Sequence, residues 1–179
     1  MTIGFFDLET QKLFAEVGGR YPEEIQTPKL GLAVAGLVID NQPIRFYEEN
    51  NVRDLIEELK KVDIIVGHNL IRFDYLVLKP YTKFNLQELK TIDMMLILDA
   101  KIRRFISLDH LAELNLGMKK TIDSIKIPGM WRNGERDAVK AYLSNDVEMS
   151  KRLYFHGKNK PIKLVHPESK KTLEIKVDW

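Results

Sequence analysis

The chain has 179 residues, of which 44% are hydrophobic and 30% charged, so it is long enough for one folded domain with a sizeable core and too apolar to be disordered. Its formal net charge of +2 is too small to indicate a nucleic-acid partner, and the absence of cysteine excludes disulfides, thiolate catalysis and cysteine zinc sites. No stretch approaches the ~20 apolar residues of a membrane helix, and the N-terminus opens into a strand-like run without a basic region or cleavage site, so we expect a cytoplasmic protein with no membrane partner.

Hydrophobic periodicity and turn residues predict the elements in chain order. We expect strands at 3–8, 30–39, 44–47 and 63–66, a loop at 10–28, helices at 51–61, 70–78, 108–116 and 137–154, a strand passing into a helix at 91–98, and a terminal hairpin at 162–166 and 172–177. This order favours an α/β fold, a mixed β-sheet flanked by helices with a small C-terminal β-hairpin. We assign residues 1–156 to one domain and residues 157–179 to a hairpin extension of it. A doubly wound nucleotide-binding fold is the alternative, disfavoured because no glycine-rich phosphate loop follows the first strand.

The first strand ends in two acidic residues that share a face. Residues alternate between the two faces of a strand, so Asp7 and Glu9 point to one side with Phe5, while Phe6 and Leu8 point to the other side, into the core. Two neighbouring carboxylates on an apolar strand repel each other and are costly to desolvate, and a divalent cation would relieve both effects. The alternative is a strand end that emerges into solvent, where the acids are harmless.

Polar residues also follow the expected strand at 63–66. His68 and Asn69 end that strand, and Asp74 lies in the helix beyond it. Ligands bind at this edge of open α/β sheets, so these side chains are candidates for contact with a substrate backbone. The alternatives are a turn histidine that bonds its own backbone and a solvated helix acid.

A tyrosine and an aspartate share one face of the expected helix at 137–154. Tyr142 and Asp146 are four residues apart, which aligns them on a helix, and Asp146 borders the apolar stripe of Val139, Leu143 and Val147. The alternative is that Tyr142 belongs to the core and Asp146 is its hydrogen-bond partner.

The three motifs occur together and in a recognisable order. Asp-x-Glu on a first strand, Asn-x₄-Asp after a later strand and Tyr-x₃-Asp on a late helix resemble the DEDD superfamily of 3′–5′ exonucleases, in its tyrosine subgroup (DEDDy), over residues 3–154. The segments 91–94 and 107–112 also resemble that superfamily. Gly18-Gly19, the Trp131 region and the ending at 177–179 are similar to uncharacterised bacterial and archaeal ribonuclease-H-like exonucleases.

The resemblance implies a ribonuclease-H-like fold and a two-metal hydrolase. Asp7, Glu9, Asp74 and Asp146 would surround two divalent ions, Mg²⁺ or Mn²⁺, with Asp7 bridging both ions and Asp74 acting through water. Glu9 and Asp146 would complete the site of the attacking water, which the Tyr142 hydroxyl would orient. The expected reaction hydrolyses single-stranded nucleic acid from its 3′ end, DNA favoured over RNA, and releases nucleoside 5′-monophosphates.

Substrate contacts are less clearly indicated by the sequence. We expect Thr10, His68 and Asn69 to bind substrate beside the acidic residues. Trp131 is equally consistent with an exposed platform and with a core anchor. Two small basic clusters are interpreted as solvated surface rather than phosphate contacts: Lys101 with Arg103 and Arg104, and Lys119 with Lys120.

Two other classes of function remain as alternatives. One is a catalytically inactive nucleic-acid-binding or helicase-accessory module of the same fold, although all five catalytic positions carry the active residue types. The other is an interaction domain whose C-terminal hairpin docks a partner, although packing of the hairpin on its own domain explains its apolar face. The expected partners are single-stranded 3′ ends, with a helicase or another repair or processing protein as a further candidate.

Overall fold

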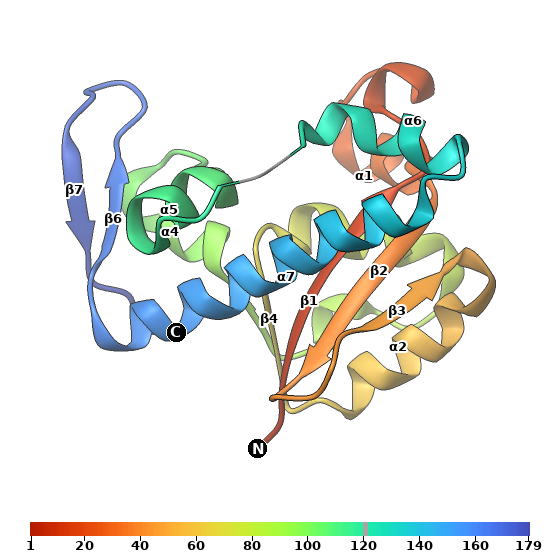
Figure 1. The fold of residues 1–179 in the computed structure, drawn as a ribbon, viewed down its shortest axis with the longest axis horizontal. Coiled ribbons are helices and arrows are strands. Elements are labelled where there is room, and N and C mark those ends of the chain that lie inside the picture. Colours follow the sequence, from red (N-terminus) through yellow and green to blue (C-terminus); the bar gives the residue numbers. More distant parts are fainter. Residues whose placement is uncertain (120–121) are drawn as a thin grey trace.

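A five-stranded mixed sheet forms the centre of the computed structural model, which describes residues 1–119 and 122–179. Its strand order is β3-β2-β1-β4-β5, with β1 antiparallel to β2 and parallel to β4, and a separate pair, β6 and β7, forms the C-terminal hairpin (Figure 1). The expected α/β, ribonuclease-H-like fold with a terminal hairpin is confirmed. The strands are β1 (Ile3–Thr10), β2 (Leu32–Ile39), β3 (Arg45–Glu48), β4 (Ile64–Gly67), β5 (Thr91–Asp93), β6 (Ile162–Val165) and β7 (Thr172–Ile175).

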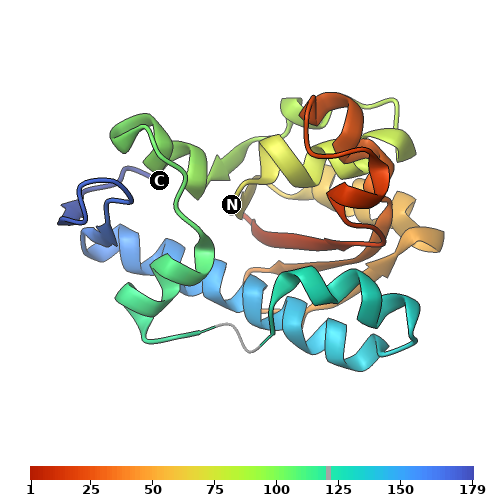
Figure 2. The ribbon, with the colours of Figure 1, turned by 90° about the horizontal axis from the view of Figure 1, so that it is seen from above.

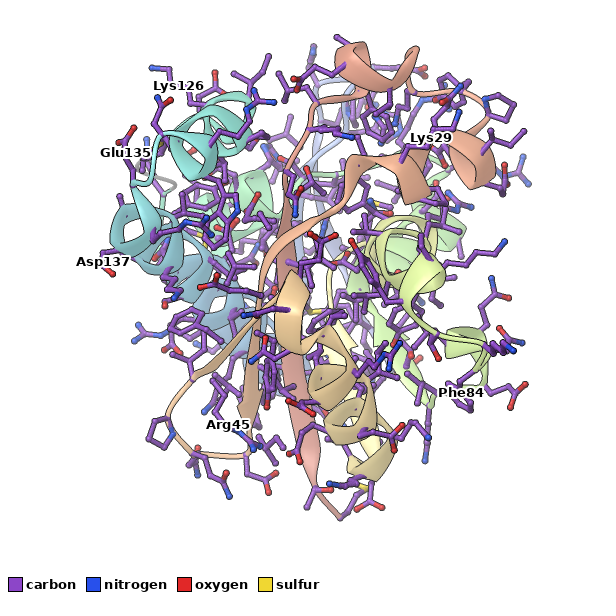
Figure 3. All side chains as sticks on the ribbon, turned by 90° about the vertical axis from the view of Figure 1, so that its right-hand side faces the viewer. Lys29, Arg45, Phe84, Lys126, Glu135 and Asp137 are labelled. Atoms are coloured by element: carbon purple, nitrogen blue, oxygen red, sulfur yellow. The ribbon has the colours of Figure 1, made fainter. Side chains whose placement is uncertain are left out.

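Helices cover both faces of this sheet. The longest, α7, lies across β1, β2 and β4 on one face, while α2 and α3 pack on the other face (Figures 1 and 3). The α-helices are α1 (Glu23–Gln26), α2 (Val52–Lys61), α3 (Tyr75–Leu78), α4 (Met94–Ile102), α5 (Leu108–Leu116), α6 (Ile127–Arg132) and α7 (Arg136–Asn159). Short 3₁₀ helices are η1 (Phe14–Val17), η2 (Thr27–Leu30), η3 (Glu49–Asn51), η5 (Lys79–Tyr81), η6 (Leu86–Glu88) and η7 (Ser124–Lys126), and η4 (Leu70–Asp74) is a π-helix.

The alternation of side chains along β1 divides the core into two layers. Phe5 packs in the layer under α7, whereas Phe6 and Leu8 pack in the layer under α2 and α3. All three are buried, which confirms the prediction that Phe6 and Leu8 are core residues. Because the central strand contributes to both layers, it holds the acidic residues at its end in a fixed position.

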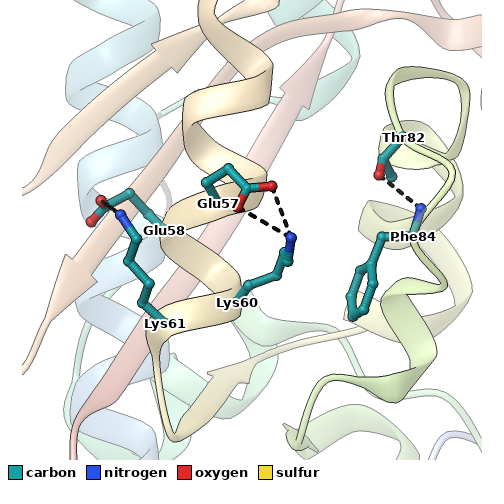
Figure 4. Close-up of polar contacts among 6 residues, drawn as sticks. All are labelled: Glu57, Glu58, Lys60, Lys61, Thr82 and Phe84. Atoms are coloured by element: carbon teal, nitrogen blue, oxygen red, sulfur yellow. Dashed lines mark hydrogen bonds and ion pairs between the residues drawn. The ribbon is translucent and has the colours of Figure 1, made fainter.

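The helix α2 shows how a single element is anchored here. Its outer surface carries ion pairs between Lys60 and Glu57 at 2.9 Å and between Lys61 and Glu58 at 3.1 Å (Figure 4). Such exposed pairs contribute only about 0.3–0.5 kcal/mol each, so burial of the apolar face stabilises the helix far more. That buried face consists of Val52, Leu55, Ile56 and Leu59.

Two stretches differ from the expectation. The segment 10–28, expected as a loop, contains η1, α1 and the start of η2. The helix α6, which was not expected, begins around Pro128 and places Trp131 in the core, with the Arg136 guanidinium 3.6 Å above its ring. Proline is favoured in the first turn of a helix, where its missing N–H needs no acceptor. Trp131 is therefore a core anchor and not an exposed platform.

The C-terminal hairpin packs on the domain itself. Ile162 and Leu164 are fully buried in the same core layer as α5 and α7, and the Asn115 amide both donates to the Lys163 carbonyl and accepts from its N–H, each at 2.8 Å. The Trp179 indole N–H donates to the Tyr154 carbonyl at 2.9 Å. The helix α7 continues to Asn159, three residues beyond the expected domain limit. In the parts of the chain that the structure describes, no helix has the length and apolar character needed to cross a membrane.

Candidate active site

Asp7 and Glu9 lie where β1 extends past its neighbour β4. The last parallel pair joins Phe5 to Val66, so the following residues of β1 reach the open edge of the sheet. A bulge between Glu9 and Thr10 shifts the register with β2 at the same place. Bulges are common next to active sites because they redirect side chains. Both carboxylates are partly buried, in contrast to the solvated strand end of the alternative interpretation.

The end of β4 approaches the backbone of β1 very closely. A Cβ atom on Gly67 would lie 2.7 Å from the Phe6 carbonyl oxygen, so only glycine fits there. After it, Asn69 adopts a left-handed conformation with φ of 71°, which asparagine tolerates better than most residues. The π-helix η4 then begins and carries Asp74 back toward the sheet. The sequence around the second motif thus directs Asp74 inward rather than into solvent.

A buried aspartate holds this turn in place. Asp93 ends β5, and its carboxylate accepts hydrogen bonds from the backbone N–H groups of Asn69 at 2.9 Å and Ile71 at 3.0 Å. The same carboxylate caps α4 by accepting from the N–H groups of Met95 and Leu96 at 3.2 and 3.3 Å. Sequence reasoning missed this role, although an aspartate directly before an apolar helix is a recognisable N-cap signal.

Asp74 is a deeply buried acid whose carboxyl pKa is strongly perturbed. Its side chain is 2% exposed, and its Oδ1 atom has no hydrogen-bond partner within the described residues. Burial raises the pKa of the Asp74 carboxyl well above its usual range, and the nearby negative charges of Asp7, Asp93 and Glu9 raise it further. The second motif is therefore electrostatically coupled to the first one.

The third motif contributes from α7. Tyr142 and Asp146 are each 2% exposed, on the helix face that packs over β1. The apolar stripe that borders Asp146 is buried as expected, with Val139, Leu143 and Val147 in the core layer under α7. A buried carboxylate that faces a cleft needs a favourable electrostatic partner in its working state.

A single cleft of about 1070 Å³ collects most of the predicted residues. Its walls come from the end of β1, the 10–20 segment, the turn after β4, the start of α5, the 122–128 segment and α7. The view from above shows η1 and α1 on one side of the end of β1 and α6 and α7 on the other side (Figure 2). The predicted residues that line the cleft are Asp7, Glu9, Thr10, His68, Asn69, Tyr142 and Asp146. Asp74 lies beneath this wall rather than on it.

The predicted substrate contacts have distinct local roles. The Thr10 hydroxyl donates to the Lys12 carbonyl at 2.9 Å, so it shapes the turn that leaves β1. The Oδ1 atom of Asn69 is buried without a hydrogen-bond partner in the described part of the chain. Its amide therefore retains an acceptor for a ligand. Cleft residues that were not singled out from the sequence include Lys12, Phe14 and Arg20.

The donor chemistry of the site fits a hard divalent cation. Carboxylate oxygens are the ligands that Mg²⁺ and Mn²⁺ prefer, and the buried Asp74 Oδ1 lacks a positive or donating neighbour. Within residues 1–119 and 122–179, however, no group of three or more histidine, aspartate or glutamate side chains is placed to hold one metal ion. The carboxylates are thus gathered at one edge of the sheet without forming a closed set of ligands.

The described residues of the two basic clusters are not among those that line the cleft. Arg104 pairs with Glu168 in the hairpin turn, and Lys119 pairs with Glu113 at 2.6 Å. Lys120 lies outside the described residues. The cleft wall includes none of Lys101, Arg103, Arg104 and Lys119.

No protein-family model matches the sequence, and no curated protein matches it. The fold is similar to a solved structure of the family B DNA polymerase from the hyperthermophilic archaeon Pyrobaculum calidifontis, with a TM-score of 0.66 and 18% sequence identity. This similarity covers 87% of the chain but 24% of the polymerase, so the chain spans about a quarter of that protein's length. At this level of identity the likeness shows the fold alone.

Proposed function

We propose that this protein is a divalent-metal-dependent 3′–5′ exonuclease of the DEDD type, with tyrosine in the third motif. It hydrolyses single-stranded nucleic acid, DNA favoured over RNA, and releases nucleoside 5′-monophosphates. One observation carries the proposal: two chain segments more than 130 residues apart bring Asp7, Glu9, Tyr142 and Asp146 to one cleft, and a third segment carries the buried Asp74, which is coupled to the first two residues.

The arrangement suits phosphodiester hydrolysis. Such a reaction forms a bond from a water oxygen to phosphorus and breaks the bond between phosphorus and the 3′ oxygen of the preceding nucleotide. A bound divalent ion would supply Lewis-acid stabilisation of the reacting oxygens. Asp7, Glu9 and Asp146 would hold it from the cleft wall, and Asp74 from beneath.

The other cleft residues have separate tasks in the proposed reaction. The Tyr142 hydroxyl positions the attacking water, because it is held on a buried helix face beside Asp146. Asn69 offers its amide to the strand that enters the cleft. The apolar side of the cleft, with Leu13, Phe14 and Phe73, receives the terminal base, and stacking of this kind tolerates any base. The matched structure belongs to a DNA polymerase, so the fold is shared with an enzyme of nucleic-acid metabolism.

A second candidate function is a catalytically inactive module that only binds nucleic acid. The absence of a closed ligand set among the described histidine, aspartate and glutamate residues favours it. The two candidates differ in one measurable respect, because an inactive module binds a strand without shortening it in any metal.

The test is digestion of matched DNA and RNA single strands that carry a label at the 5′ or the 3′ end. We expect 5′-labelled strands to shorten stepwise and 3′-labelled strands to release a labelled mononucleotide first, in Mg²⁺ or Mn²⁺ and not in EDTA. The Asp7→Ala protein, purified in parallel, controls for a contaminating nuclease. Digestion from the 5′ end, or digestion that persists in chelator, would contradict the proposal.

A further inference from the structure

An exposed aromatic side chain lies beside the rim of the cleft. Phe105 is 57% exposed, in the segment between α4 and α5, while the next residue, Ile106, is buried in the core. Ser107, two residues further, lines the cleft. A single exposed phenylalanine is ordinary on a protein surface, so the contacts of the Phe105 ring decide whether it has a role.

The Phe105 ring is held by an arginine from the second motif. The Arg72 guanidinium carbon lies 5.1 Å from the ring centroid, and one of its nitrogens lies 3.4 Å from the Asp99 carboxylate. Arg72 precedes Phe73, which lines the cleft. The ring and the guanidinium therefore form one surface that joins the cleft through two different segments of the chain.

The chain segment that carries Phe105 also carries positive charge that the protein itself does not neutralise. Arg103 has a left-handed conformation with φ of 56°, and its N–H donates to the Asp99 carbonyl at 2.6 Å, which fixes the end of α4. Lys101 and Arg103 are exposed and pair with no carboxylate in the part of the chain that the structure describes. Arg104 is different, because Glu168 of the hairpin turn holds it.

We propose that Phe105, Arg72 and Arg103 form a subsite for single-stranded nucleic acid outside the cleft, where a base stacks on Phe105 and the adjoining phosphates contact the arginines. This subsite rests on the proposed exonuclease function and extends it: it binds a nucleotide on the 5′ side of the terminal one, which occupies the cleft. Stacking on an aromatic ring flanked by cations is the usual way in which proteins hold a single strand without reading its sequence. A protein partner is the less favoured occupant, because one aromatic ring among charged side chains offers little apolar area.

The test measures binding of a 5′-labelled thymidine oligonucleotide of about 12 nucleotides and of one of about three nucleotides, in EDTA so that no strand is cut. We expect Phe105→Ala to weaken binding of the longer strand by roughly 5- to 100-fold and to leave the shorter strand unaffected. Phe105→Trp should restore binding and Phe105→Leu should not, because only an aromatic face stacks. Arg103→Ala should lower the salt dependence of binding, with a slope smaller by about 0.7.

Arg53→Ala is the matched control, because Arg53 is exposed on α2 and lies far from this surface in the fold. The subsite would be overturned if the wild type, Phe105→Ala and Phe105→Trp bound the longer strand with equal affinity. It would also be overturned if a protein partner bound this surface in place of the strand. Stepwise digestion by a Phe105→Ala protein with unchanged KM for long strands would overturn the subsite and leave the proposed function intact. Phe105-dependent binding without digestion in any metal would support the subsite and contradict the exonuclease.

Discussion

The Asp93 carboxylate accepts a hydrogen bond from the backbone N–H of Asn69 at 2.9 Å, although the two residues are 24 positions apart. The same carboxylate caps α4, so the end of β5 fixes the turn that delivers the second motif. The geometry of the candidate site thus depends on a residue that does not line the cleft.

We expect Asp93→Ala to lower the free energy of unfolding by about 3 kcal/mol, because it removes a helix cap and leaves buried N–H groups without an acceptor. Urea denaturation measures this loss. Asp123→Ala is the matched control, since Asp123 caps η7 from an exposed position through one hydrogen bond to Ile125 at 3.1 Å. Equal losses in the two proteins would show that the Asp93 contacts do not stabilise the turn.

The raised pKa of Asp74 predicts a pH dependence of stability in the metal-free protein. An acid with a raised folded-state pKa stabilises the fold below its unfolded pKa near ~3.9, and this contribution is lost as the pH rises through the folded pKa. Asp74→Asn should therefore have a higher Tm than the wild type at neutral pH in EDTA, and the difference should shrink toward pH ~4.

Asp63→Asn provides the opposite case for comparison. The Thr2 backbone N–H and hydroxyl lower the pKa of the Asp63 carboxyl, so its contribution is present at neutral pH and is lost as the pH falls through the folded pKa. A Tm of Asp74→Asn below that of the wild type at neutral pH would contradict this prediction. It would mean that contacts with neighbouring groups stabilise the ionised carboxylate by more than burial destabilises it.

Asp7→Ala should be the most damaging single change to activity, because Asp7 is the residue assigned to both metal ions in the proposed site. Tyr142→Phe removes one hydroxyl and leaves every carboxylate, so we expect a loss on the order of 10²-fold, as for removal of one positioning donor. Steady-state rates of mononucleotide release in Mg²⁺ measure both losses. If Tyr142→Phe were as inactive as Asp7→Ala, the tyrosine would have a larger role than positioning water.

Thermal unfolding can detect the metal site without any assay of activity. Millimolar Mg²⁺ should raise the Tm of the wild type, because an ion that binds only the folded protein stabilises it. The Mg²⁺-induced shift in Tm should be much smaller for Asp7→Asn. In EDTA the same substitution should raise the Tm, because the neutral amide relieves carboxylate repulsion and increases the free energy of unfolding by ~1 kcal/mol. Equal Mg²⁺ shifts in both proteins would show that Asp7 does not contribute to a shared site.

Ca²⁺, with its longer and looser coordination, should stabilise the fold while supporting little cleavage.

Gly67→Ala should destabilise the protein by about 1–3 kcal/mol, because the new Cβ would lie 2.7 Å from the Phe6 carbonyl oxygen and the strand would have to shift. Gly129→Ala is the control, since a Cβ there meets nothing within 4 Å and alanine favours the α6 helix. Comparison of the two melting temperatures separates the effect of close strand packing from a general effect of the added methyl group.

Local patterns in the sequence predicted much of the fold. The alternation along β1 correctly placed Phe6 and Leu8 in one core layer and Phe5 in the other. The helix 108–116 was predicted with its observed bounds, because Gly117 ends it in the left-handed conformation that glycine favours.

The misses have physical reasons. Residues 127–132 form a helix through the burial of Trp131 against α7, a tertiary contact that propensity cannot indicate next to Pro128 and Gly129. The hydrogen bond from the Asn69 N–H to the Asp93 carboxylate joins residues far apart in sequence, and a motif search does not detect such a contact. Motif spacing also gave no information on the Phe105 surface, because it forms from the contact of two separate segments.

The position of α7 across the centre of the sheet has a consequence for synthesis on the ribosome. Asp7 and Glu9 are made more than 130 residues before Tyr142 and Asp146, which lie on the helix that covers Phe5. A nascent or prematurely terminated chain that ends before α7 would carry the first acids but neither the tyrosine nor the last aspartate. The proposed nuclease activity would therefore require that α7 has been made and has packed on the sheet.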